Sequence, residues 1–305
     1  MPTEGGWFQM KMRLVPALVV PLALAASLAL TGCGEGAGDG GGNAADARTV
    51  KVAKSFWHSG FKVTLGTATV VSPPTTGTPA VTEPPTMTIE ATFQNLGESN
   101  HAFPSPMVIS SAGKHHTQAG PQQELPVIPG QASQSGTIAF VVDESFRLLD
   151  AVLTVGSADR RQAVVPLTSA DGLVSLAPRA FEVNGKASNG PDFYATVESG
   201  ELRADNPEGY GEAKAGNEFL RLRFSVTNDG PGMLAILYGL SNRLSLPDGS
   251  SVGITTLCGN PQLHPGPHAT AREGVVCFEV PAPAGGEYLY AITGDDAEGL
   301  RFTIA

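Results

Sequence analysis

Two cysteines and two histidines in the C-terminal part of the chain have the types and spacing for either a disulfide or a metal site. Cys258 and Cys277 are 19 residues apart, and His264 and His268 lie between them. Thiolates and imidazoles are zinc ligands, but His264-Pro-Gly-Pro-His268 cannot be helical, so the spacing of four does not place both rings on one helix face. In an extracytoplasmic chain an even pair of cysteines favours a disulfide. We therefore predict a Cys258–Cys277 disulfide, with a metal site as the alternative.

Other groups of potential metal ligands have less suitable spacing. His115 and His116 are adjacent, and neighbouring residues on a strand point to opposite faces. Asp295-Asp296 with Glu298 offers three carboxylates, but it lacks the alternating spacing of an EF-type calcium loop. His58, beside Trp57, has no acidic or nucleophilic partner in the nearby sequence, so we expect it to pack at the edge of a core. We expect no metal and no cofactor.

Local motifs of common enzymes are absent. The chain has no Gly-x-Ser-x-Gly, no His-Glu-x-x-His, no P-loop and no Gly-x-Gly-x-x-Gly after a strand. Because catalytic triads assemble from distant residues, a hydrolase with an unrecognised site stays a weaker alternative. With 19 basic against 29 acidic residues the chain is also a poor match for a nucleic-acid phosphate backbone. We predict a protein that is not an enzyme and does not bind nucleic acid.

The N-terminus has the pattern of a bacterial lipoprotein signal peptide. Lys11 and Arg13 precede an apolar run over 14–30, which ends in Leu30-Thr31-Gly32-Cys33. The small residues 31 and 32 allow a signal peptidase to cleave before Cys33. The resemblance implies a signal peptide over 1–32, two acyl chains with a diacylglyceryl thioether on Cys33, and an anchor in the outer leaflet of the cell membrane. A short transmembrane anchor is the alternative.

A glycine-rich stretch follows Cys33. Residues 33–47 contain no apolar period, so they cannot bury enough surface to fold and are predicted to be a flexible tether. Met10 and Met12 stand just before the basic residues, so the true start could be Met1, Met10 or Met12.

Beyond residue 48 the chain consists of short strand patterns separated by turn residues, and the pattern occurs twice. Strands of alternating polarity bounded by Gly, Pro, Asn and Asp predict an all-β fold. An offset of 132 to 138 aligns 61–70 with 193–202, 88–97 with 221–230, and 136–140 with 274–278. A slowly drifting offset is typical of an internal duplication with loop insertions.

Each copy has the size and patterning of an immunoglobulin-like β-sandwich. The strand that ends in Asn95-x-Gly97 or Asn228-x-Gly230, the following hairpin, and Gly136-x-x-x-Phe140 or Gly274-x-x-x-Phe278 resemble the immunoprotective-antigen-like domains of secreted mycobacterial antigens. Tandem copies of such domains occur on lipoproteins of Gram-positive bacteria. The resemblance implies an extracytoplasmic location and no catalytic residues. We predict sandwiches over 48–168 and 179–305, joined by a linker over 169–178.

The two copies differ in charge and in their longest loop. Residues 48–168 carry 8 basic and 8 acidic side chains, whereas 179–305 carry 9 and 16. The second copy has acidic residues and Tyr210 in the loop over 204–217, which is either a recognition surface or an ordinary solvated loop. These features favour an anchored protein that binds an extracytoplasmic protein or peptide. A small-ligand or metal-binding accessory lipoprotein is the alternative, and the disulfide is expected to stabilise only the second sandwich.

Overall fold

The computed structural model describes residues 47–72, 84–118, 125–232, 242–258, 263, 265–292 and 297–305. These residues belong to one compact unit and are nearly all β. In this part of the chain the helices are two 3₁₀ turns, η1 (Leu148–Asp150) and η2 (Thr256–Cys258), and neither has the length or the apolar character to cross a membrane. The predicted signal peptide 1–32, the peptidase box Leu30, Thr31 and Gly32, and the lipid attachment residue Cys33 lie outside the described residues.

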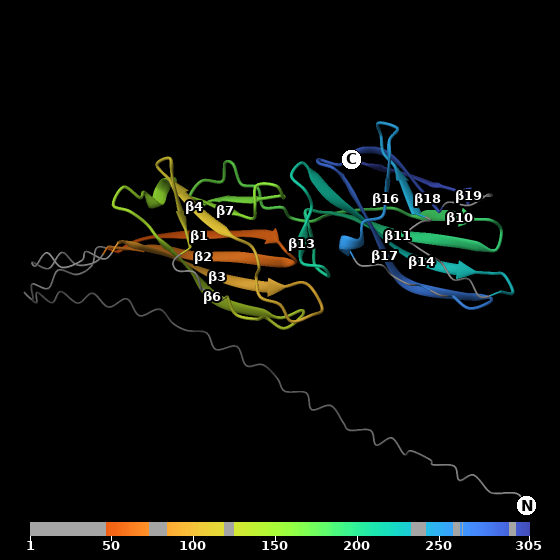
Figure 1. Cartoon of the computed structure of the whole chain (residues 1–305), viewed down its shortest axis with the longest axis horizontal. Helices are drawn as coiled ribbons and strands as arrows, with labels where there is room; N and C mark the ends of the chain where they lie inside the picture. The colour runs from red at the N-terminus through yellow and green to blue at the C-terminus, as the bar shows by residue number, and fades with distance from the viewer. Residues whose placement is uncertain are drawn as a thin grey trace, which may run out of the picture. The chain divides into compact units, whose positions relative to one another are not determined.

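The first half folds into two antiparallel sheets of four strands each. One sheet has the order β1-β2-β3-β6, and the other has the order β5-β4-β7-β8. Figure 1 shows the first sheet as one layer with β4 and β7 in a second layer above it. The strands of the two sheets are β1 (Ala47–His58), β2 (Phe61–Val71), β3 (Thr86–Asn95), β4 (Met107–Ser111), β5 (Lys114–Thr117), β6 (Ser133–Val141), β7 (Val152–Val155) and β8 (Ala163–Pro166).

The second half repeats this arrangement. One sheet has the order β17-β14-β11-β10-β19 with β9 also paired to β11, and the other has the order β16-β15-β18-β20. The strands are β9 (Arg179–Phe181), β10 (Gly185–Asn189), β11 (Phe193–Arg203), β14 (Asn217–Asn228), β15 (Asn242–Ser245), β16 (Ser251–Gly253), β17 (Ala269–Pro281), β18 (Gly286–Ile292), β19 (Ala297–Glu298) and β20 (Leu300–Ile304). A separate two-stranded hairpin consists of β12 (Asp205–Asn206) and β13 (Gly211–Glu212). The predicted all-β sandwich fold is confirmed.

The Asn-x-Gly turns have the same role in both sandwiches. The Asn95 side chain accepts a hydrogen bond from the Gly97 amide at 2.9 Å and donates to the Ser99 carbonyl at 2.8 Å. Asn228 likewise accepts from the Gly230 amide at 3.0 Å and donates to the Gly232 carbonyl at 2.8 Å. Both asparagines are fully buried, so each side chain satisfies backbone groups that the end of the strand would leave unpaired.

A β-bulge interrupts the alternation of β2 and β11 at equivalent positions. In β2 the register to β3 shifts between Leu65 and Ala68, and in β11 the register to β14 shifts between Val197 and Ser199. The alternation of buried residues resumes after the bulge, so two successive residues of each strand, 66 and 67 in β2 and 198 and 199 in β11, lie away from the core. The bulge therefore creates an opening on the outer face of each long sheet.

Each sandwich has its own hydrophobic core. Phe61, Phe93 and Phe140 are among the fully buried side chains of the first core, and Phe224, Phe278 and Tyr290 of the second. The predicted linker is ordered and packs on the first half: Val174 pairs with Val164, and Leu176 lies in the first core. Ala204, directly after β11, also belongs to the first core, so the two halves share a boundary that is packed.

Candidate functional site

The hairpin over residues 205–212 docks on the end of the first sandwich. We call these residues the docking hairpin. Asp205 accepts a hydrogen bond from the Gly60 amide at 2.7 Å, and the Tyr210 ring stacks on His101 with ring centroids 3.9 Å apart. Gly97 must be glycine for this contact, because a Cβ there would be 2.4 Å from the Tyr210 hydroxyl. The loop that the sequence presented as a recognition surface or a solvated segment thus recognises the chain's own first sandwich.

A buried polar cluster joins the docking hairpin to His58. The His58 ring is fully buried, and its Nδ1 lies 3.0 Å from Glu212 Oε1 and 2.7 Å from Ser105 Oγ. Ser59 donates a hydrogen bond to the same Glu212 oxygen, and His58 Nε2 donates to the Arg161 carbonyl at 3.1 Å. His58 therefore has an acidic partner, 154 residues away along the chain, that its own sequence neighbourhood did not reveal.

The cluster holds a serine, a histidine and a glutamate, but its geometry differs from a hydrolase triad. In a triad the nucleophile contacts one imidazole nitrogen and the carboxylate contacts the other. Here Ser105 and Glu212 both meet Nδ1 of His58, and Nε2 donates to a backbone carbonyl. A Cβ at position 156 would lie 2.4 Å from His58 Nε2, so the Gly156 backbone packs directly against this nitrogen. The arrangement is that of a polar contact between two sandwiches.

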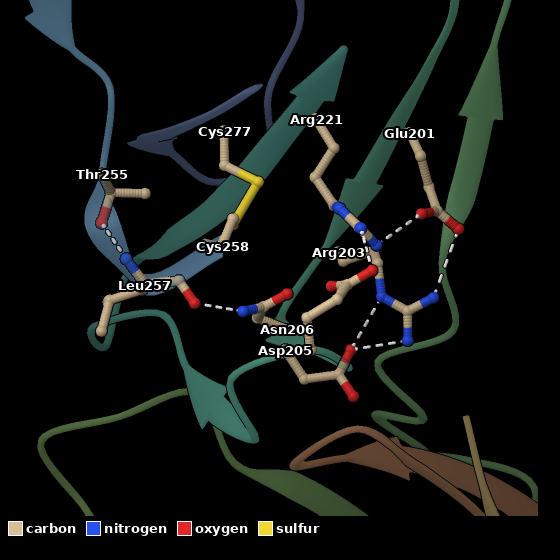
Figure 2. The surroundings of a disulfide bond; sticks show 10 residues. Glu201, Arg203, Asp205, Asn206, Arg221, Thr255, Leu257, Cys258 and Cys277 are labelled. Atoms are coloured by element: carbon tan, nitrogen blue, oxygen red, sulfur yellow. Dashed lines mark hydrogen bonds and ion pairs between the residues drawn. A yellow bond between two sulfur atoms is a disulfide. The ribbon is translucent and has the colours of Figure 1, made fainter. Parts of the chain in front are cut away.

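A chain of ion pairs runs from the docking hairpin into the sheet of the second sandwich (Figure 2). Arg203 Nη2 lies 2.9 Å from Asp205 Oδ1, and both side chains are almost fully buried. Glu201 reaches Arg203 at 3.3 Å through one oxygen and Arg221 at 3.4 Å through the other. Glu208, from the docking hairpin, pairs with Arg221 at 2.7 Å. Buried charges are stable only when paired, so these five side chains act as one unit.

Two of these five side chains, Glu201 and Arg221, also line an open groove on the second sandwich. The groove has a volume of about 600 Å³ and lies at the β11 bulge, on the sheet face that points away from the core. We call it the bulge groove. Its lining residues come from β9, β11, β14, β17 and the residue after β9: Ala180, Phe181, Glu182, Glu198, Ser199, Gly200, Glu201, Arg221, Arg223 and Val275.

Packing at Gly200 shapes the bulge groove. A Cβ at Gly200 would lie 2.2 Å from the Phe181 ring, so only glycine lets β9 pair closely with β11 there. Within the described residues, Glu182, Glu198 and Arg223 have no side chain of opposite charge within 4.0 Å. The groove therefore combines an ion-paired wall with unpaired charges of both signs.

An equivalent opening exists at the β2 bulge of the first sandwich. It has a volume of about 470 Å³ and is lined by short polar residues such as Thr64, Thr92 and Thr137, with Glu90 as its one charged lining residue among those described. The Glu90 carboxylate accepts a hydrogen bond from the Thr67 amide at 3.3 Å. Arg223 takes the place of Glu90 in the second copy, at the aligned offset of 133. The bulge is thus common to both sandwiches, whereas charged lining residues concentrate in the second.

The residues singled out from the sequence have different outcomes. Cys258 and Cys277 form a disulfide with a Cα–Cα distance of 5.9 Å, so neither sulfur is a thiolate ligand. His268 is described but His264 is not, and Asp295 and Asp296 also lie outside the described residues. Across the described ranges no group of three or more His, Cys, Asp or Glu side chains is arranged to hold a metal.

His115 and His116 lie on β5, the strand at one edge of the second sheet of the first sandwich. His115 is exposed, whereas the His116 ring packs edge-on against Phe146 with ring centroids 5.5 Å apart. Their opposite directions follow the alternation of a strand, as expected.

Sequence reasoning missed the bulge groove and the docking contacts. Arg221 and Arg223 follow the alternation of a strand with one solvated face, so nothing in their spacing marks them as special. The difference between the two copies was the available signal, because the second copy has more charged residues at its bulge and more acidic residues in its long loop than the first.

No protein-family model matches the chain, and no curated protein is similar to it. Two solved structures from Bacillus anthracis are similar at a low level. A conserved hypothetical protein is 13% identical with a TM-score of 0.33, and the match covers 40% of this chain and 96% of that protein. A conserved domain protein is 10% identical with a TM-score of 0.24, and the match covers 84% of this chain and 90% of that one.

Proposed function

We propose that the chain is a lipid-anchored extracytoplasmic protein, without catalytic activity, that binds a protein or peptide through the bulge groove. The observation that carries the binding role is the unpaired charge of both signs, on Arg223, Glu182 and Glu198, around one open groove. The anchor rests on the Leu30-Thr31-Gly32-Cys33 pattern after an apolar run and on the resemblance to tandem sandwich lipoproteins. The disulfide supports an oxidising compartment outside the cytoplasm.

The anchor has a direct test. We expect the chain with Cys33 to enter the detergent-rich phase when cells are extracted by temperature-induced detergent phase separation, because two acyl chains give stable membrane attachment. The control chain carries Cys33→Ala and has residues 1–32 replaced by a cleavable secretory signal without a lipoprotein box; it is expected in the aqueous phase, since it lacks both the apolar run and the sulfur that carries the lipid. Mass spectrometry of the mature N-terminus checks the modification itself. Recovery of both chains from the aqueous phase would contradict the anchor.

A polypeptide is the partner that best fits the bulge groove. An extended peptide presents side chains of both signs at regular spacing, so a basic residue can meet Glu182 and Glu198 while an acidic residue meets Arg223. A polyanion fits less well, because Glu182 and Glu198 in the same groove would repel it while Arg223 alone would attract it without already being paired to a described carboxylate. The groove residues stand on hydrogen-bonded strands, since β14 pairs with β11 on one side and with β17 on the other.

The groove is tested by photocrosslinking on intact cells. A photoreactive amino acid at Ser199, which is exposed in the groove, is expected to give a discrete protein adduct. Arg223→Glu should lower the yield about tenfold or more, because it places a third unpaired carboxylate beside Glu182 and Glu198 and repels an acidic partner group. Arg243→Glu is the matched control, since Arg243 is an exposed arginine on β15 of the opposite sheet.

Equal adduct yields from the Arg223→Glu and Arg243→Glu chains would show that the groove does not carry binding. An adduct that is equally strong when the crosslinker is moved to an exposed position of β5, and that survives Arg223→Glu, would assign the contact to the first sandwich. Either result overturns the groove as the binding surface and leaves the anchor untouched.

A further inference from the structure

A second pocket lies at the boundary of the two sandwiches, away from the bulge groove. It has a volume of about 440 Å³ and is lined by the end of the ordered linker, the end of β11 and the loop after β17. We call it the seam pocket. Leu176, Leu202 and Pro283 contribute apolar walls, and Arg161, Arg179 and Glu218 contribute the charged groups. Pockets of this size with apolar walls and a few charged groups, between two folded parts of a chain, are typical of small-molecule sites.

The wall formed by the linker is held in an unusual backbone conformation. Leu176 has a φ of +57°, in the left-handed region that residues other than glycine seldom adopt. The Ser175 carbonyl accepts a hydrogen bond from the Trp57 amide at 2.8 Å, and Val174 pairs with Val164, so the segment directly before Leu176 is fixed to the first sandwich. Strained backbone of this kind concentrates at ligand sites because surrounding structure must hold it in place.

Of the charged residues that line the seam pocket, Arg161 is not paired with any carboxylate in the described part of the chain. Glu218 is buried and accepts hydrogen bonds from Arg179 at 3.0 Å and from the Ala284 amide at 2.6 Å, so its charge is compensated. Among the residues that the structure describes, no carboxylate lies within 4.0 Å of the Arg161 guanidinium. The backbone of Arg161 is fixed as well: its amide donates to the Ala213 carbonyl at 3.0 Å. A partly buried guanidinium beside apolar walls is a site for an anion with an apolar body.

We propose that the seam pocket binds a small aliphatic carboxylate of medium chain length. The carboxylate head pairs with Arg161, and the alkyl chain lies against Leu176, Leu202 and Pro283. The proposal is independent of the bulge groove, since it uses none of the groove residues. Because the lining residues come from both sandwiches, an occupied pocket would also stabilise the boundary between them.

The test uses octanoate as the probe and the chain over residues 34–305, which lacks the apolar run and Cys33 and keeps the whole compact unit, so that no detergent competes for the pocket. Isothermal titration calorimetry is expected to show one saturable site for octanoate. Acetate has the same head without the alkyl chain, and octylammonium has the same chain with a cationic head. Both are expected to bind at least tenfold more weakly than octanoate, because each lacks one of the two interactions that the pocket offers.

Three substitutions locate the site. Arg161→Gln should weaken octanoate binding at least tenfold, whereas Arg161→Lys keeps the charge and should stay within a few-fold of the unsubstituted chain. Ala177→Trp, at an exposed position that lines the pocket, should fill the space and abolish binding without altering a core. Arg223→Gln in the bulge groove is the matched control and should leave octanoate binding unchanged.

Equal affinity for octanoate and octylammonium would overturn the proposal, because it would indicate a nonspecific apolar contact. Octanoate binding that persists in the Ala177→Trp chain would overturn it too, since the ligand would then lie elsewhere. If Arg161→Gln impairs folding, as circular dichroism would show, the Arg161→Lys and Ala177→Trp results decide the matter by themselves.

Discussion

Replacing Asp205 with alanine is expected to lower the free energy of unfolding by about 3–5 kcal/mol, the cost of removing one partner from a buried ion pair. Asp205 is 1% exposed, and its partner Arg203 is 6% exposed. Without the carboxylate, Arg203 keeps only Glu201, at 3.3 Å, and the Gly60 amide loses its acceptor in the docking hairpin. Urea-induced unfolding followed by circular dichroism measures the loss.

Two controls separate the buried charge from the loss of side-chain volume. The double substitution Arg203→Met with Asp205→Leu removes both charges and should recover most of the lost stability, since replacing a whole buried pair with apolar residues is often neutral. Asp171→Ala, at an exposed position of the linker, should change stability by no more than about 0.5 kcal/mol. A loss below about 1 kcal/mol in Asp205→Ala would show that the pair is solvated in solution.

Removal of the disulfide is expected to have the second largest effect, about 3 kcal/mol for a closed loop of this size on the chain-entropy estimate. The Cys258→Ala, Cys277→Ala chain opens a loop of 19 residues. The effect should extend beyond the second sandwich, because Asn206 of the docking hairpin donates a hydrogen bond to the Leu257 carbonyl, next to Cys258 (Figure 2). Gly209 also packs against that carbonyl, because a Cβ at position 209 would lie 2.4 Å from the Leu257 oxygen.

Hydrogen exchange shows whether loss of the disulfide affects the second sandwich alone or also the docking hairpin. If the bridge supports the docking hairpin, the Gly60 amide, which bonds to Asp205, should exchange faster in the cysteine-free chain. Unchanged protection at Gly60 together with faster exchange in β17 would restrict the bridge to the second sandwich, which is what the sequence alone led us to expect. Reduction of the unsubstituted chain should reproduce the double substitution.

The sandwich architecture was predictable because its signals are local. The alternation of Phe61, Val63 and Leu65 recurs in Phe193, Ala195 and Val197, and both sets are buried as the strand pattern requires. Asn95 and Asn228 end equivalent strands with the same hydrogen bonds, which the repeated Asn-x-Gly pattern indicated. Such features depend only on residues near in sequence or on comparison of two copies.

The docking contacts were not predictable because they depend on how distant segments come together. Glu212 lies in a loop rich in glycine and acidic residues, where the sequence indicates solvent, yet its carboxylate meets the fully buried ring of His58. Leu176 enters the first core from a segment that composition marks as a linker. In both cases contacts with residues far away along the chain decide burial, and no local period encodes those contacts.

The segment that carries Cys258 has a consequence for contacts between copies of the protein. β17 is the last strand of its sheet, with 13 residues, and a strand at a sheet edge offers unpaired backbone groups to any neighbouring strand. The Thr255 amide donates a hydrogen bond to the Cys277 carbonyl at 2.9 Å, so the segment 255–258 covers this part of the edge. The disulfide links that segment covalently to β17. The bridge thereby holds a cover over the edge at Cys277, so we expect a reduced chain to self-associate by strand addition more readily than an oxidised one.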